Sequence, residues 1–161
     1  MSGLTDTDLH HLRRCVELAG LALAEGDEPF GSVLVGGDGQ VLFEDHNRVK
    51  GGDATRHPEL AIAQWAAAQL SPGARAAATV YTSGEHCAMC AAAHGWAELG
   101  RIVYVVAGAR LAELREQWGL APSPVAALPI TAVAPRVPVE GPVPQLAGEV
   151  EAMYERCFGP Q

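Results

Sequence analysis

The chain has 161 residues, of which 48% are hydrophobic and 19% charged, and its formal net charge at pH 7 is −8. This length and composition predict one compact domain over residues 1–161 and exclude a disordered chain. The acidic balance argues against nucleic acid as a partner, because counterion release from phosphates favours a basic surface. No apolar run reaches the length of a membrane span and no basic-then-apolar leader is visible, so we expect a cytoplasmic protein without a membrane partner.

Periodicity and turn signals divide the chain into alternating helices and strands. Apolar residues recur at helical spacing from Leu9 to Leu23, whereas 101–106 is a continuous run of strand-forming residues. Seven of the eleven prolines fall within 121–144, so we expect that segment to be mostly extended, with a last edge strand at Ile130–Val133. The other predicted elements, in chain order, are a helix at 6–23, a hairpin of strands 31–36 and 41–45, a loop at 46–56, a helix at 58–70, a strand at 78–83, a helix at 87–99 capped by Gly100, a strand at 101–106, and helices at 111–118 and 145–158.

This order of elements predicts an α/β fold. An opening hairpin followed by alternating helices and strands is typical of a mixed sheet with helices on both faces. With five predicted strands, we expect a three-layer α/β/α sandwich around a mixed five-stranded sheet. Functional groups on such sheets gather where strands end and the following helices begin, which is where the predicted helices near residues 57 and 87 start.

Cys87 and Cys90 lie three residues apart at the start of a predicted helix. Thiolates are stabilised at a helix N-terminus, which suits a redox pair, a structural metal clip or half of a catalytic metal site. A structural zinc clip uses four protein ligands, and neither Cys15 nor Cys157 has a second cysteine at ligand spacing. The pair alone leaves these alternatives open.

The stretch His57-Pro58-Glu59 favours the catalytic alternative. His57, Cys87 and Cys90 together make three zinc ligands and leave one tetrahedral position open for water, as in catalytic rather than structural zinc sites. Glu59 stands two residues from the histidine, where it is placed to take a proton from that water. We therefore predict Zn²⁺ as the cofactor and Glu59 as the catalytic residue.

His57-Pro58-Glu59 together with Cys87-Ala88-Met89-Cys90 resembles the zinc signature of the cytidine deaminase-like superfamily. Residues 28–33 resemble the first strand of guanine deaminases and tRNA adenosine deaminases, and 45–48 resemble the segment whose Asn binds the base in those enzymes. The span 46–59 is also similar to fungal cytosine deaminase, and the whole resemblance covers about residues 6–110. This chain departs from the family at Pro58, where Ala or Gly is usual, and at His86, where Pro is usual.

The resemblance implies a zinc-dependent hydrolytic deaminase that removes the exocyclic amino group of a small nucleobase, nucleoside or related heterocycle, of guanine or cytosine type, and releases ammonia. Asn47 would then hold the ring, and Phe30 would form an apolar wall of the pocket or belong to the core. His86 is expected to line the pocket mouth or cap its helix, and Glu85 to orient a ligand or pair with Arg48. The resemblance also implies a homodimer, in which the C-terminal helix would cover this chain's own site or its partner's.

Two other functions remain open. The first alternative is a tRNA or other nucleic-acid adenosine deaminase, against which the net charge of −8 counts. The second is a zinc-stabilised domain without activity, in which the position of Glu59 would be a coincidence.

Overall fold

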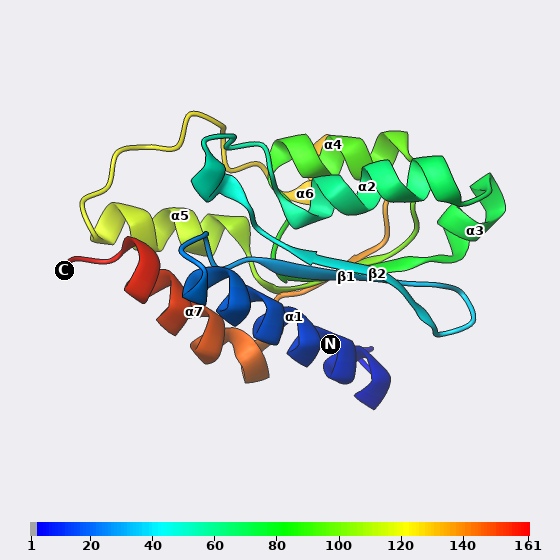
Figure 1. Cartoon of the computed structure of the whole chain (residues 1–161), viewed down its shortest axis with the longest axis horizontal. Coiled ribbons are helices and arrows are strands. Elements are labelled where there is room, and N and C mark those ends of the chain that lie inside the picture. Colours follow the sequence, from blue (N-terminus) through cyan, green and yellow to red (C-terminus); the bar gives the residue numbers. More distant parts are fainter. Residues whose placement is uncertain (1–2) are drawn as a thin grey trace.

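A mixed five-stranded sheet forms the centre of the computed structural model, which describes residues 3–161 (Figure 1). The strand order is β2-β1-β3-β4-β5, in which β1 pairs antiparallel with β2 and β3, while β3, β4 and β5 run parallel. This arrangement confirms the predicted α/β class with a mixed five-stranded sheet. The strands are β1 Gly31–Val35, β2 Val41–His46, β3 Thr79–Gly84, β4 Ile102–Val106 and β5 Val139–Glu140.

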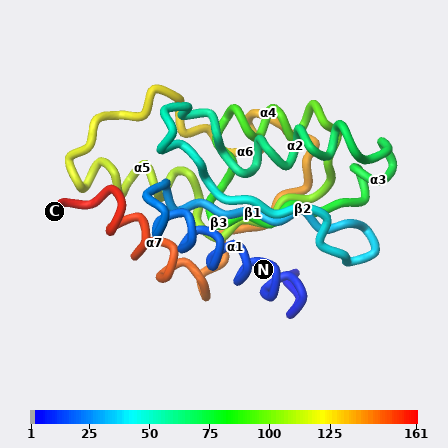
Figure 2. The backbone as a smooth tube through the Cα atoms, viewed as in Figure 1, coloured from blue at the N-terminus to red at the C-terminus, as the bar shows by residue number. Residues whose placement is uncertain are grey.

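Helices cover both faces of the sheet (Figures 1 and 2). One face carries α1 and α7, and the other carries α2, α4 and the short α6. α5 packs against α7 at the end of the sheet where the C-terminus lies. The helices are α1 Asp6–Ala24, η1 Val49–Gly51, α2 Pro58–Gln69, α3 Pro72–Ala77, α4 Ala88–Trp96, α5 Gly108–Gln117, α6 Ile130–Val133 and α7 Pro144–Phe158.

The two faces of the sheet bury separate apolar clusters because successive side chains of a strand point to opposite sides. In β4, Val103 and Val105 pack against α1 and α7, whereas Ile102 and Tyr104 pack against α2 and α4. Every residue of β4 is buried, which explains why it reads as a continuous apolar run. Among residues 3–161, no helix is both long and apolar enough to cross a membrane.

The N-terminus of α1 is tied to the sheet through Asp8. The side chains of Thr5 and Asp8 form a capping box, in which each accepts a hydrogen bond from the other's backbone amide. The carboxylate of Asp8 also accepts hydrogen bonds from the Tyr81 hydroxyl at 2.6 Å and from the Arg101 guanidinium at 3.0 and 3.1 Å. A single buried carboxylate therefore links α1 to β3 and to the start of β4.

The predicted edge strand at Ile130–Val133 is wrong: these residues form helix α6, and the edge strand is β5, where Val139 pairs with Ile102. Ile130 is buried in the cluster beneath α2 and α4, so tertiary packing overrides the strand propensity of this short run. The CxxC helix also ends earlier than predicted, at Trp96. Gly100 is not its cap; a Cβ there would lie 2.5 Å from the carbonyl oxygens of Ala76 and Ala78, so the glycine permits a close backbone approach.

Candidate active site

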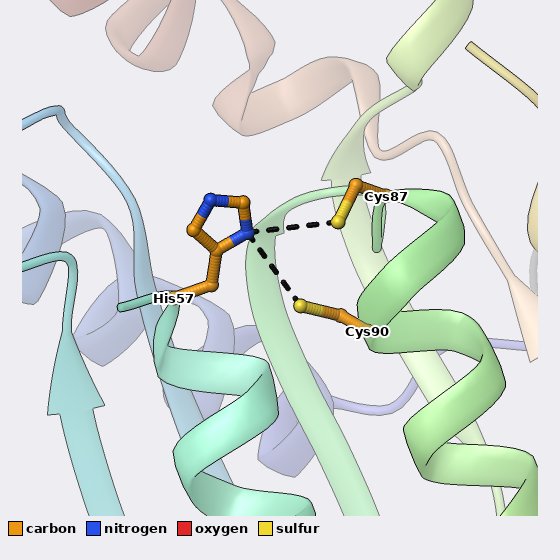
Figure 3. A group of neighbouring side chains, drawn as sticks. All are labelled: His57, Cys87 and Cys90. Carbon is orange, nitrogen blue, oxygen red and sulfur yellow. Dashed lines mark hydrogen bonds between the residues drawn. The ribbon is translucent and has the colours of Figure 1, made fainter. Parts of the chain in front are cut away.

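Three metal-ligand side chains converge where α2 and α4 begin. His57 is the N-cap residue of α2, since Pro58 occupies the first helical position, and Cys87 is the N-cap residue of α4. The Nδ1 atom of His57 lies 3.6 Å from the Sγ atoms of both Cys87 and Cys90. The three side chains point toward one another from two neighbouring helices (Figure 3).

The chemistry of this donor set fits Zn²⁺. Zinc binds imidazole nitrogen together with thiolate sulfur, and three protein donors leave a fourth position free for water or substrate. A hydrogen bond from the Cys90 thiol, assisted by His57, lowers the pKa of Cys87 to about 4. The same hydrogen bond and burial raise the pKa of Cys90. One sulfur is thus a thiolate at neutral pH, the form that binds a metal.

Glu59 lies in the first turn of α2, is only 6% exposed, and interacts electrostatically with His57 and Cys87. Burial raises its pKa to about 7, although the positive charge of His57 and a hydrogen bond from Ser32 act in the opposite direction. A carboxyl group with a pKa near neutrality can both accept and donate a proton at physiological pH. The arrangement is therefore suited to moving a proton rather than only to balancing charge.

A pair of buried hydroxyl groups on the sheet, one of which donates to Glu59, connects this carboxyl group to strands β1 and β3. Ser32 Oγ donates to Glu59 Oε1 at 3.0 Å and lies 2.8 Å from Thr82 Oγ1. Ser32 and Thr82 are directly opposed on the antiparallel strands β1 and β3, and both are completely buried. Neither residue belongs to the motifs that predict the site from the sequence. The alternation of β1 was the available signal, since Ser32 shares a face with Leu34, which packs beneath α2.

Asn47 is 1% exposed at the end of β2, and its amide is oriented by the backbone. Its Oδ1 atom accepts hydrogen bonds from the Glu28 and Val49 amides at 3.2 and 3.1 Å. The oxygen is thus fixed, and only the amino group of the side chain remains to donate to a ligand.

Phe30 packs against the C-terminal helix. Its ring lies 5.5 Å from the ring of Tyr154 and 6.5 Å from that of Phe158, both in α7. Gly84, at the end of β3, leaves room for this contact: a Cβ there would lie 2.8 Å from the Tyr154 hydroxyl and 3.3 Å from Phe30. From the sequence, Tyr154 was expected only as part of a C-terminal helix that covers a site.

Glu85 joins two segments that follow the site in the chain. Its Oε1 and Oε2 atoms accept hydrogen bonds from the Gly108 and Ile130 amides, each at 2.9 Å. Its carboxylate is thus used to hold the starts of α5 and α6, while Arg48 pairs with Asp45 at 2.8 Å.

His86 is 2% exposed and packs edge-on against His94, with the ring centroids 5.6 Å apart. Its Nδ1 atom has no hydrogen-bond partner among the described residues. Burial lowers the pKa of His86 well below its usual value, so the ring is neutral at physiological pH. A neutral aromatic ring therefore occupies the position at which the cytidine deaminase-like superfamily usually has proline.

Known proteins share this sequence pattern and fold. Residues 5–106 match the family described as the cytidine and deoxycytidylate deaminase zinc-binding region. A probable cytosine deaminase of Schizosaccharomyces pombe is 32% identical over 121 residues, which cover 74% of this chain and 72% of the relative. A tRNA-specific adenosine deaminase of Agrobacterium fabrum is 39% identical over 82 residues, 50% of this chain and 53% of the relative.

A solved structure of a guanine deaminase from Nitrosomonas europaea superposes with a TM-score of 0.63 at 20% identity, covering 92% of this chain and 82% of that one. At that identity the likeness concerns the fold. The family match spans more than half of the chain and contains the three converging ligands and Glu59. The chain therefore belongs to the cytidine and deoxycytidylate deaminase zinc-binding family.

Proposed function

We propose that this protein is a zinc-dependent hydrolytic deaminase that removes the exocyclic amino group of a small nucleobase, nucleoside or related heterocycle and releases ammonia. The observation that carries the proposal is the convergence of His57, Cys87 and Cys90 beside the buried carboxyl group of Glu59. A metal clip without activity needs no titratable group at that position. A pKa raised to about 7 suits Glu59 to acid–base work.

In this proposal His57, Cys87 and Cys90 hold the zinc ion. When bound, zinc lowers the pKa of a coordinated water from about 15.7 to about 7, which supplies the nucleophile for hydrolysis at neutral pH. Glu59 would accept one proton of the attacking water and pass it to a ring nitrogen of the substrate. It would then accept the second proton, from the hydroxyl group added to the ring, and pass it to the amine, which leaves as ammonia. Ser32 keeps Oε1 of Glu59 in place during these transfers, through the hydrogen bond at 3.0 Å.

The substrate is held by Asn47 and Phe30. Because the Asn47 oxygen is occupied by two backbone amides, its amino group is the part that faces substrate, and it requires a hydrogen-bond acceptor on the ring. A ring carbonyl of cytosine or guanine supplies such an acceptor. The similarity to a probable cytosine deaminase and the shared fold with a guanine deaminase support this substrate class.

A tRNA adenosine deaminase is the second candidate function. It is favoured by the 39% identity to a tRNA-specific adenosine deaminase. A solved structure from work on tRNA:A34 deaminases is also similar: it is 32% identical, the match covers 61% of this chain and 75% of that one, and the TM-score is 0.53. The formal net charge of −8 counts against binding a polyanion. Strongly salt-dependent binding of tRNA would reverse this ranking.

The central test combines ammonia release with metal analysis. Wild-type protein is screened against guanine, adenine, cytosine, their nucleosides, pterins and aminotriazines. We expect Glu59→Gln to abolish ammonia release while the zinc content stays at the wild-type level. Glu116→Gln, which changes an exposed carboxylate of α5, serves as the matched control and should remain active. Full activity in Glu59→Gln would exclude Glu59 as the proton shuttle.

We further propose that the protein works as a homodimer in the cytoplasm. Four cysteines without a disulfide among them agree with a reducing compartment. Trp96, the last residue of α4, is 87% exposed and offers an apolar contact for a second copy.

A further inference from the structure

A second group of side chains that could bind a metal shares no residue with the His57–Cys87–Cys90 group. Glu25 caps the C-terminus of α1, Asp27 follows in the next loop, and His46 is the last residue of β2. One ligand atom from each of the three lies within 4.8 Å of the others. The proposed deaminase mechanism uses none of these side chains.

His46 is oriented as a metal-binding imidazole is. The residue is only 7% exposed, and its Nδ1 atom lies 2.9 Å from the carbonyl oxygen of Asn47. Since a carbonyl oxygen can only accept, Nδ1 carries the hydrogen, and the neutral ring has a lone pair on Nε2. That Nε2 atom makes no hydrogen bond within the described structure and faces the Glu25 carboxylate at 3.5 Å. A backbone carbonyl that fixes the opposite ring nitrogen is the usual support of a histidine ligand.

The two carboxylates leave lone pairs for an ion. Asp27 is buried, and among residues 3–161 its carboxylate accepts one hydrogen bond, from the Lys50 amide to Oδ1 at 3.0 Å. Glu25 is half-exposed, so its carboxylate can move onto an ion at little cost. One imidazole and two carboxylates form a harder donor set than His57 with two thiolates, and they suit Mn²⁺ or Zn²⁺.

We propose that Glu25, Asp27 and His46 form a second divalent-metal site, distinct from the His57–Cys87–Cys90 site. The ammonium group of Lys50, which donates to the Glu25 carbonyl oxygen at 2.5 Å, opposes a dication and makes this the weaker site. A bound ion joins the end of α1 to the end of β2. It thereby fastens the backbone of Asn47, whose carbonyl oxygen holds His46 and whose side chain holds Glu28.

The proposal is tested by titrating Mn²⁺ into zinc-loaded protein and following the electron paramagnetic resonance signal of free Mn²⁺. The thiolate site is then filled, and Mn²⁺ is in any case a poor partner for sulfur. We expect the wild type to take up one Mn²⁺ per chain. Glu25→Gln should weaken uptake by at least the roughly tenfold that losing even an outer-shell partner costs. Glu17→Gln, another carboxylate on α1, should bind as the wild type does.

Two further variants sharpen the result. Electron spin-echo modulation of the bound Mn²⁺ should show a coupled imidazole nitrogen that His46→Gln removes. Lys50→Met should tighten binding, because it removes the adjacent positive charge. If wild-type protein takes up no Mn²⁺, or if Glu25→Gln binds it equally well, Glu25 and His46 form an ion pair only and the proposal fails. Neither result depends on deaminase activity, so the two proposals fail separately.

Discussion

Glu59 shows how a few neighbouring atoms set the chemistry of a residue. Burial raises its pKa to about 7, and the Ser32 hydroxyl, itself in contact with Thr82, limits that rise by bonding to the carboxylate. A hydrogen bond to the charged form of a carboxyl group lowers its pKa, and losing that bond raises it. Ser32 is therefore placed to tune the proton affinity of Glu59 without touching substrate.

Ser32→Ala is expected to shift the acidic limb of the kcat profile to higher pH. Loss of one hydrogen bond is worth about 0.5–1.5 kcal/mol, so kcat at pH 7 should fall roughly two- to tenfold with zinc content unchanged. Ser83→Ala is the matched control, since its hydroxyl accepts from the Gly31 amide at 3.1 Å and makes no hydrogen bond to Glu59. A pH profile of Ser32→Ala that overlays the wild type would remove Ser32 from the mechanism.

At the scale of elements, contacts between α1 and the sheet hold the framework on which the site stands. A Cβ on Gly31 would lie 2.5 Å from the Cys15 carbonyl oxygen, so β1 and α1 meet at backbone contact. Near the N-terminus of α1, the Asp8 carboxylate accepts hydrogen bonds from Tyr81 of β3 and from Arg101 at the start of β4. Burial raises the pKa of Asp8, but hydrogen bonds from Arg101 and Tyr81 outweigh it and hold that pKa well below the usual value.

Because the folded-state pKa of Asp8 is lowered, its stabilising contribution is complete above the unfolded pKa of about 3.9 and is lost as pH falls below that value. Asp8→Asn should reduce the free energy of unfolding at pH 7 by roughly 1.5–3 kcal/mol, with a smaller loss at pH 3, as measured by urea denaturation. Asp6→Asn, which changes a neighbouring exposed carboxylate, should cost at most about 1 kcal/mol. An equal effect of both variants would contradict this role of Asp8.

At the scale of the whole molecule, α2 and α4 carry the site at their N-termini, and Trp96, the last residue of α4, is a large apolar side chain that is 87% exposed. α2 is apolar around most of its circumference; Trp65, for example, stacks on Phe43 of β2 at 5.3 Å. A helix that is apolar on several faces is typical of one covered on more than one side. The side of α4 that carries Trp96 is the surface we expect a second copy to bury.

Trp96→Glu is therefore expected to shift the protein from dimer to monomer in light scattering coupled to gel filtration. A charge placed in an apolar interface carries a desolvation cost that the free monomer avoids. Leu21→Glu, at a 48% exposed position on α1, provides the control and should leave the dimer intact. A wild-type monomer, or a dimer unaffected by Trp96→Glu, would refute this interface.

From the sequence alone, periodicity predicted the α/β class and the mixed five-stranded sheet, whereas the deaminase family was predicted from the resemblance of the local motifs HxE and CxxC to a known zinc signature. The roles of Asn47, Phe30, His86 and Glu85 in binding substrate stay predictions. Ile130–Val133 was misassigned because burial under α2 and α4, which no four-residue pattern reveals, decides its conformation.

Only the tertiary structure decided which residues surround the motif. Ser32 and Thr82 lie 50 residues apart, and Glu25 and His46 belong to different elements, so no local pattern relates them. Strand pairing brings the first pair behind Glu59, and the packing of α1 on β1 and β2 brings the second pair together. The candidate zinc ligands can thus be predicted from the short motifs HxE and CxxC. The proton affinity of Glu59 and the Glu25–Asp27–His46 group depend instead on long-range contacts.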